Sequence, residues 1–227
     1  MILSNVQKRI CEQIINVFET GAAEGDYSNI SIYADGPHGI RQITYGRAQT
    51  TEYGNLRELV SMYVDAGGTY SGALAPYLDK IGSDSTLVNN TAFKNLLREA
   101  GRKDAVMRST QDRFFDKRYF KPAMKWADEN GFTDALSALV IYDSFIHSGS
   151  ILWTIRNMFG ESPPAAGGNE RVWISKYVNC RHTWLANHPK TILHATVYRT
   201  TCFKTQITRS NWDLSLLPIR ANGVNIS

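Results

Sequence analysis

The sequence predicts a mainly α-helical fold of the α+β kind, with one small β-sheet near the amino-terminal end. Apolar residues recur at helical spacing over most of the chain after residue 54, whereas short alternating segments are confined to residues 26–52. Residues 133–147 form the most apolar helical stretch and are expected to lie at the centre of the core. No internal repeat or flexible linker divides the 227 residues, so we expect one domain with two lobes over residues 1–227.

The first helix is predicted over residues 4–20. Ser4 and Gln7 have the spacing of a capping box, and Gly21 follows the last helical position. The apolar stripe of this helix consists of Val6, Ile10, Ile14, Val17 and Phe18.

Two short segments, 30–33 and 40–45, alternate in polarity and are separated by an Asp-Gly-Pro turn, which is typical of a β-hairpin. Further helical patterns follow, and Pro122 is expected in the first turn of one of them. Their approximate ranges are 56–63, 74–81, 91–100, 105–115, 122–129, 133–147 and 169–186. The last 30 residues are predicted to be irregular.

Composition excludes several classes of protein. The longest apolar run, residues 135–141, is far too short to span a membrane. The first residues carry Lys8 and Arg9 and no long apolar stretch, so no signal peptide is predicted. We therefore expect a protein made in the cytoplasm that reaches a cell wall by lysis, virion delivery or another export route.

Cysteine and histidine spacing predicts neither a metal site nor a cofactor. Cys11, Cys180 and Cys202 form no CxxC pair and are expected to be reduced thiols in or near the core. The net charge of +4 favours an anionic partner. No nucleic-acid-binding motif accompanies that charge, so a nucleic-acid partner is not expected.

Two acidic residues suggest a chemistry. Glu19 stands at the end of the first predicted helix, and Asp35 lies on the turn before the second alternating segment. Enzymes that cleave glycosidic bonds use a pair of carboxylic acids, one to protonate the leaving oxygen and one to activate water or attack the sugar. Asp26 and Glu24 are the alternative partners for Glu19.

An ordered set of motifs over roughly residues 5–205 resembles the glycoside hydrolase family 46 chitosanases of the lysozyme-like superfamily. The set comprises Phe18-Glu19, Asp35-Gly36, Gln42-Ile-Thr-Tyr-Gly46, Gly54-Asn-Leu-Arg-Glu-Leu59, the stretch from Asp112 to Pro122, the stretch from Ile141 to Gly149, and Gly167-Gly-Asn-Glu170 with Arg181. The resemblance implies a catalytic domain of two helical lobes with the small sheet at the cleft.

The resemblance also implies roles for individual residues. Glu19 would be the general acid and Asp35 the general base of an enzyme that inverts the anomeric configuration, with either Gln42 or Thr44 holding the attacking water. A buried network behind Glu19 would consist of Asp143, Arg181 and Arg199. The resemblance places Asn55 at a substrate-binding position. By residue type, Tyr33 and Tyr45 are expected to stack on sugar rings and Arg41 to hold an acidic polymer.

One departure from the family pattern bears on the substrate. The chitosanases have an aspartate that grips a protonated glucosamine where this chain has Asn55. Together with the net basic charge, this favours bacterial peptidoglycan, cleaved by an endo-acting, lysozyme-like or phage-lysin-like enzyme. The alternatives are a chitosanase acting on chitosan and a non-catalytic wall-binding or phage structural protein. A monomer is expected.

Overall fold

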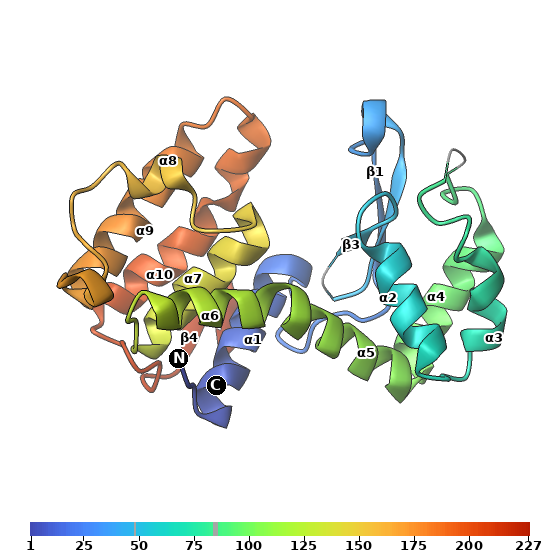
Figure 1. The fold of residues 1–227 in the computed structure, drawn as a ribbon, viewed down its shortest axis with the longest axis horizontal. Coiled ribbons are helices and arrows are strands. Elements are labelled where there is room, and N and C mark those ends of the chain that lie inside the picture. Colours follow the sequence, from blue (N-terminus) through green and yellow to red (C-terminus); the bar gives the residue numbers. More distant parts are fainter. Residues whose placement is uncertain (48, 84–85) are drawn as a thin grey trace. The chain divides into compact units, whose positions relative to one another are not determined.

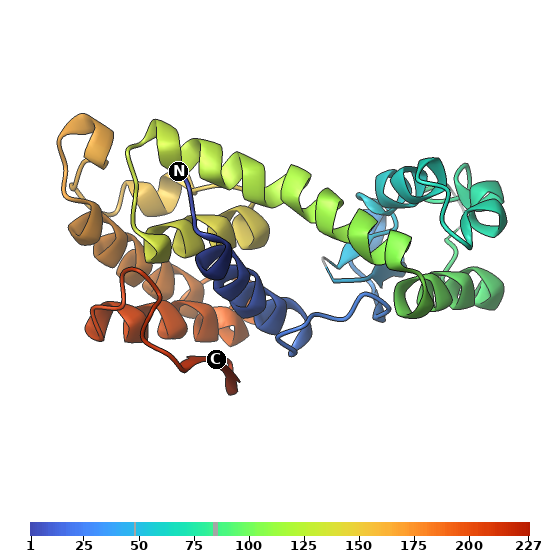
Figure 2. The same cartoon turned by 90° about the horizontal axis from the view of Figure 1, so that it is seen from below.

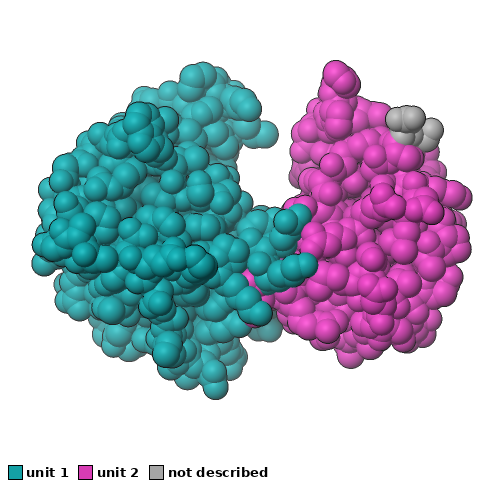
Figure 3. Space-filling model, in the orientation of Figure 1, with its two compact units in different colours: residues 1–24, 117–227 teal, residues 25–116 magenta. Residues whose placement is uncertain are grey.

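The computed structural model describes residues 1–47, 49–83 and 86–227 and is mostly helical with a small antiparallel sheet, as predicted (Figures 1 and 2). The chain divides into two compact units. Unit 1 combines Met1–Glu24 with Lys117–Ser227, and unit 2 consists of Gly25–Asp116 (Figure 3). Within the described ranges, no helix combines the length and apolarity needed to cross a bilayer.

Unit 1 is built around the helix α7, Ala135–Ser148. Every residue of α7 from Ala135 to Ser144 is buried, in agreement with the expected central helix. Helices α1, α6, α9 and α10 all contact α7, so it is enclosed on several sides (Figure 1). The other elements of the unit are α1 Asn5–Thr20, α6 Lys121–Glu129, α8 Trp153–Arg156, η4 Pro164–Ala166, α9 Glu170–Ala186, η5 Thr191–Thr196, α10 Val197–Thr208, β4 Ile219–Ala221 and β5 Val224–Ile226. The π-helical segment η3, Asp116–Phe120, begins at the last residue of unit 2 and leads into α6.

Helix α1 has the ends that its sequence predicts. The Ser4 hydroxyl accepts from the backbone of Gln7, the Gln7 side chain accepts from the backbone of Ser4, and Gly21 ends the helix with φ 77°. Val6 is an exception to the predicted apolar stripe, because 66% of it is exposed. The carboxyl-terminal end of α1, which carries Glu19, is thus fixed by the cap at Gly21.

The prediction of an irregular carboxyl-terminal end was wrong. Helix α10 packs on α9, and β4 pairs with β5 in an antiparallel hairpin beside α1. The buried side of α10 includes the polar Arg199, Thr200 and Gln206. An apolar stripe was therefore missing from the sequence, although a helix is present.

Unit 2 contains a three-stranded antiparallel sheet and a group of helices. The strand order is β1-β2-β3, with Ile30 opposite Tyr45 and Thr44 opposite Thr51. The elements are β1 Ile30–Tyr33, η1 Pro37–Gly39, β2 Gln42–Tyr45, β3 Thr50–Thr51, α2 Leu56–Asp65, α3 Ser71–Leu74, η2 Ala75–Tyr77, α4 Thr91–Lys103 and α5 Ala105–Phe115.

A buried carboxylate fastens the sheet of unit 2 to the chain that follows it. Glu52, which is 1% exposed, accepts from the backbone N–H of Ile43 at 3.2 Å and of Leu87 at 2.6 Å, and from the hydroxyl of Thr86 at 3.0 Å. These bonds to both carboxylate oxygens offset the cost of burying the charge. The bond from Ile43 holds β2 in place at the residue that follows Gln42.

Candidate active site

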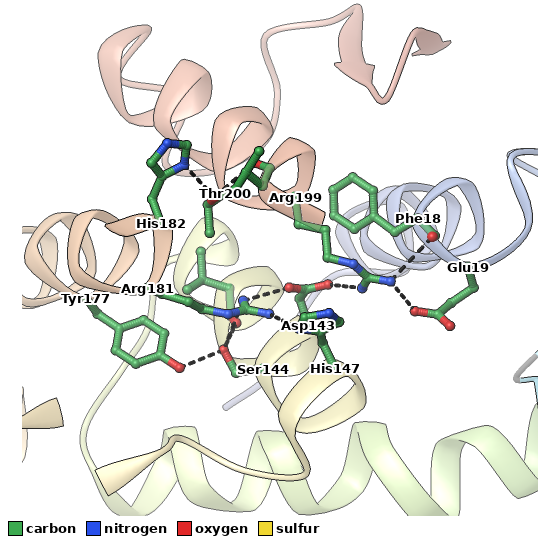
Figure 4. A network of polar contacts seen from close by, with 12 residues as sticks. Phe18, Glu19, Asp143, Ser144, His147, Tyr177, Arg181, His182, Arg199 and Thr200 are labelled. Carbon is green, nitrogen blue, oxygen red and sulfur yellow. Dashed lines mark hydrogen bonds and ion pairs between the residues drawn. The ribbon is translucent and has the colours of Figure 1, made fainter. Parts of the chain in front are cut away.

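Glu19 is held in unit 1 by a chain of buried ion pairs (Figure 4). Its Oε1 lies 2.5 Å from Nη2 of Arg199, and Nη1 of Arg199 lies 2.7 Å from Oδ1 of Asp143. The other oxygen of Asp143 lies 2.7 Å from Nη1 of Arg181. The structure thus brings together the four residues that the sequence placed in one network.

The charges of this network depend on one another. Asp143 and Arg181 have no exposed side-chain surface, and Arg199 has 5%. Burial disfavours the ionised form of Asp143, but the guanidiniums of Arg181 and Arg199 outweigh it and hold the pKa of this carboxyl below its usual value. Burial alone would lower the pKa of Arg199. The carboxylates of Asp143 and Glu19 outweigh this effect and raise the pKa of Arg199 above its usual value.

Helix α10 also holds the backbone at the end of α1. The Phe18 carbonyl accepts from the Tyr198 hydroxyl at 2.9 Å and from Nη2 of Arg199 at 3.3 Å. The Phe18 ring packs against the Tyr198 ring, and the Arg199 guanidinium lies 5.2 Å from the Phe18 ring centroid. One guanidinium therefore orients both the Glu19 carboxylate and the peptide that carries it.

Three further side chains complete the network and were not predicted to belong to it. The Ser144 hydroxyl accepts from the Tyr177 hydroxyl at 3.0 Å and from Nη1 of Arg181 at 3.3 Å, and Nη2 of Arg181 lies 3.3 Å from Nδ1 of His147. Because His147 stands at the end of the apolar stretch 133–147, its sequence position predicts only a cap for the carboxyl-terminal end of the helix. Its position four residues after Asp143 in an apolar helix places both on one face, and this spacing was an available signal that sequence reasoning missed.

Asp35 is exposed in unit 2 and is held by Gln42. The Gln42 amide accepts from the backbone N–H of Tyr53 at 3.1 Å and donates to Oδ1 of Asp35 at 2.9 Å. Gln42 is 5% exposed, so its amide is fixed. A Cβ on Gly36 would lie 2.7 Å from the Ile40 side chain, which explains why glycine follows Asp35 in this tight turn.

Of the two residues predicted to hold water, Gln42 contacts Asp35. Thr44 is 4% exposed, and its hydroxyl has no hydrogen-bond partner within the described residues. Of the alternative bases, Asp26 accepts from the backbone N–H and the hydroxyl of Ser28 in a local turn, and Glu24 is exposed, as Asp35 is.

The predicted substrate-binding residues lie in different environments. Tyr33 is 56% exposed, Arg41 is exposed, and Asn55 precedes the first residue of α2. Tyr45 requires a correction, because it has no exposed surface and its hydroxyl donates to the Leu97 carbonyl at 2.7 Å. A side chain that fills the core of unit 2 presents no face to a sugar, so Tyr45 is structural.

The described residues contain no group of three or more His, Cys, Asp or Glu side chains arranged to hold a metal ion. Cys11 and Cys202 are buried, Cys180 is partly buried, and all three are free thiols. Two carboxyl groups singled out by the sequence, Glu19 and Asp35, are each held by one neighbour, Arg199 and Gln42 respectively.

Comparisons of the sequence and of the structure with known proteins point to one family. Residues 13–219 match glycosyl hydrolase family 46. The chain is 31% identical over 200 residues to a chitosanase of Bacillus subtilis (strain 168), covering 82% of this chain and 69% of the relative. It is similar to the crystal structure of the native chitosanase from Bacillus subtilis MY002, with 26% identity, a TM-score of 0.85 and full coverage of both chains. A complex of a Gynuella sunshinyii chitosanase with chitotetraose matches with 25% identity and a TM-score of 0.83, covering 99% of this chain and 98% of the other.

Proposed function

The chain belongs to glycosyl hydrolase family 46 and is a glycoside hydrolase with a lysozyme-like fold, and we propose that it is an endo-acting chitosanase that hydrolyses β-1,4 bonds of chitosan. The single observation that carries this proposal is the ion-pair chain that holds Glu19 through Arg199 and Asp143 in a chain of this family.

Glu19 is proposed as the general acid. Arg199 occupies Oε1, so a proton on Oε2 is available to the glycosidic oxygen as the bond to the sugar breaks. The buried pairs of Arg199 fix the direction of this carboxyl before substrate arrives. The entropic cost of orienting the acid is therefore not added to the activation barrier.

Asp35 is proposed as the general base of an inverting reaction. Gln42 donates to Oδ1 and leaves Oδ2 to accept a proton from the attacking water. The carbonyl of the Gln42 amide is occupied by Tyr53, so Gln42 orients Asp35 and we assign the positioning of the base to it. Tyr33, Arg41 and Asn55 remain the proposed substrate-binding residues, and Asp143 and Arg181 the residues that position Arg199.

Chitosan replaces peptidoglycan as the favoured substrate. The net charge and Asn55 favoured peptidoglycan, but the comparisons support the alternative, because the Bacillus subtilis relative is a chitosanase and the Gynuella sunshinyii structure is one with chitotetraose. A net charge describes the whole surface and does not identify what one site binds.

The test of the proposal is the release of reducing ends from chitosan. Glu19→Gln is expected to reduce kcat at least about a hundredfold, since it removes the proton donor. Glu12→Gln makes the same change on the same helix and is expected to retain the wild-type rate. Full activity of Glu19→Gln would contradict the assignment.

Asp35→Asn is expected to lower kcat by a similar factor, with Asp26→Asn as its control. If Asp26→Asn alone abolished turnover, Asp26 and not Asp35 would be the base. A protein that bound chitosan without releasing product at any time would instead be a non-catalytic binder. Faster cleavage of purified bacterial wall than of chitosan would contradict the assignment of chitosan as the substrate.

A further inference from the structure

A small pocket in unit 1 lies against the far end of the Glu19 network. It is formed by the carboxyl-terminal ends of α7 and α9 and by the segment around η5, and its volume is about 260 Å³. Drug-sized ligands occupy pockets of about 300–1,000 Å³, so this pocket suits a single ring. We name it the His147 pocket; its lining consists of His147, Ser148, Leu152, Trp184, His188, Lys190 and Leu193.

The imidazole of His147 is a fixed donor in this pocket. Its Nδ1 accepts from the Arg181 guanidinium, which has no acceptor, so the ring hydrogen must lie on Nε2. Burial and the neighbouring Arg199 and Arg181 lower the pKa of His147 to about 4, and Asp143 offsets this only in part, so the ring is neutral near pH 7. Nε2 has no hydrogen-bond partner within the described residues.

Two other side chains of the pocket, His188 and Lys190, are also donors, and the Ser148 hydroxyl can donate or accept. Nδ1 of His188 accepts from the backbone N–H of Lys190 at 3.0 Å, which again leaves the hydrogen on Nε2. The Lys190 ammonium is exposed and has no carboxylate partner in the described part of the chain. Among the described residues, none that lines the pocket carries a carboxylate, and the sequence has no Asp or Glu between Glu170 and Asp213.

The apolar part of the lining suits a ring face or a methyl group. The partly buried indole of Trp184 meets the His188 imidazole edge to face, with ring centroids 4.5 Å apart. Leu152 and Leu193 complete the apolar surface. Aromatic faces next to hydrogen-bond donors are a common way to hold a small polar ring.

We propose that the His147 pocket binds one N-acetylglucosamine residue of a partly acetylated chitosan, an inference that rests on the proposed function. The acetamido group supplies a carbonyl acceptor for the donors and a methyl group for the apolar lining. The ammonium of a glucosamine residue would face Lys190 and imidazole N–H groups with no carboxylate, which is unfavourable.

The pocket is also connected to the proposed acid. Its wall residue His147 touches Arg181, and Arg181, Asp143 and Arg199 lead by ion pairs to Glu19 (Figure 4). A sugar carbonyl bound to Nε2 of His147 would therefore contact the same group of side chains that orients Glu19.

The experiment compares cleavage of fully deacetylated and partly acetylated chitosan of equal chain length. Mass spectrometry locates N-acetylglucosamine in the products, and we expect it to be enriched at one position over a random distribution. Lys190→Glu replaces a donor by a carboxylate and is expected to lower this enrichment about tenfold, the effect of losing one hydrogen bond to a charged group. Lys204→Glu makes the same charge change on α10, outside this pocket, and is expected to leave the enrichment unchanged.

Direct binding is measured on Glu19→Gln, which does not turn over substrate under the proposed function. Addition of the trimer of N-acetylglucosamine is expected to shift the NMR signal of the Trp184 indole N–H, and Trp184→Phe is expected to bind more tightly than Trp184→Ala. No positional enrichment, equal effects of Lys190→Glu and Lys204→Glu, or a Trp184 signal that responds to inorganic phosphate and not to the sugar would each overturn the inference. Failure of the wild-type protein to cleave either polymer would instead refute the proposed function.

Discussion

The carboxylate of Asp143 is buried between two guanidiniums, and this sets what its removal would cost. Asp143→Ala leaves Arg181 without an ion-pair partner in a site with no exposed surface and leaves Arg199 with Glu19 alone. Loss of one partner from a buried ion pair costs about 3–5 kcal/mol, so we expect the free energy of unfolding in urea to fall by that amount.

A surface pair provides the control for this prediction. Asp79 pairs with Arg57 at 2.9 Å, but 94% of the Asp79 side chain is exposed. Asp79→Ala is expected to change the free energy of unfolding by less than about 1 kcal/mol. Similar losses in the two variants would show that burial does not strengthen the Asp143 pairs.

The imidazole of His147 makes stability depend on pH. Its pKa is about 4 in the folded protein and 6.5 in an unfolded chain, so the unfolded state binds more protons between these values. Stability contributed by His147 is therefore complete above pH 6.5 and is lost as the pH falls towards 4, by up to about 3 kcal/mol. The charged groups facing the ring are Asp143, Arg181 and Arg199, and His188 shares its pocket.

His147→Gln separates this contribution from that of Asp143, whose depressed pKa also gives stability that is lost on acidification. The glutamine carbonyl can accept from Arg181 but does not titrate. In urea unfolding at about pH 7 and about pH 4.5, the difference in stability is expected to be smaller in His147→Gln than in the wild type. An unchanged difference would mean that His147 does not titrate in this range.

At the scale of residues, the sequence predicted the Glu19 network better than the Asp35 environment. Asp143, Arg181 and Arg199 came from family motifs and meet in the structure. Whether Tyr45 faces a sugar or the core could not be predicted, because alternation in a short strand does not say which side is covered. The helices of unit 2 cover that side and bury Tyr45 completely.

Helix α4 shows how close packing can reverse the usual preference for alanine over glycine. A Cβ on Gly101 would lie 2.2 Å from the Tyr27 carbonyl oxygen, which is backbone and has little freedom to move. Alanine stabilises an open helical site, but here we expect Gly101→Ala to lower the free energy of unfolding by about 1–3 kcal/mol.

Gly72 in α3 is the matched position, since a Cβ there meets no atom within 4 Å. Gly72→Ala is expected to raise the free energy of unfolding by about 0.4–1 kcal/mol. Thermal unfolding of both variants measures the two effects, and stabilisation by Gly101→Ala would contradict the predicted clash.

At the scale of elements, the sequence predicted the helices whose buried faces are apolar and missed the others. Helix α10 turns Arg199, Thr200 and Gln206 inward and so has no apolar stripe. The β4–β5 hairpin did carry a signal, because Asn222-Gly223 is a common two-residue turn and both residues have positive φ, 42° and 88°. Tertiary packing explains the first error, and an overlooked turn explains the second.

At the scale of the whole molecule, unit 1 consists of two chain segments separated by all of unit 2. Helix α1 belongs to the first segment, and α7, β4 and β5, which it contacts, belong to the second. If unit 2 unfolded alone, these contacts would close a disordered loop of about a hundred residues, at a cost of roughly 4–5 kcal/mol. We therefore propose that the two units unfold together, as one domain with two lobes.

The distribution of tryptophan makes this last proposal testable. Trp126, Trp153, Trp173, Trp184 and Trp212 all lie in unit 1, so tryptophan fluorescence reports unfolding of that unit, whereas far-UV circular dichroism reports both. Gly101→Ala lies in unit 2, yet it is expected to lower the tryptophan midpoint in urea by as much as the dichroism midpoint, because coincident transitions are the signature of one cooperative unit. If the variant shifted only the dichroism signal and left the fluorescence transition in place, the units would be separate domains, and the loop-closure cost would be too small to couple them.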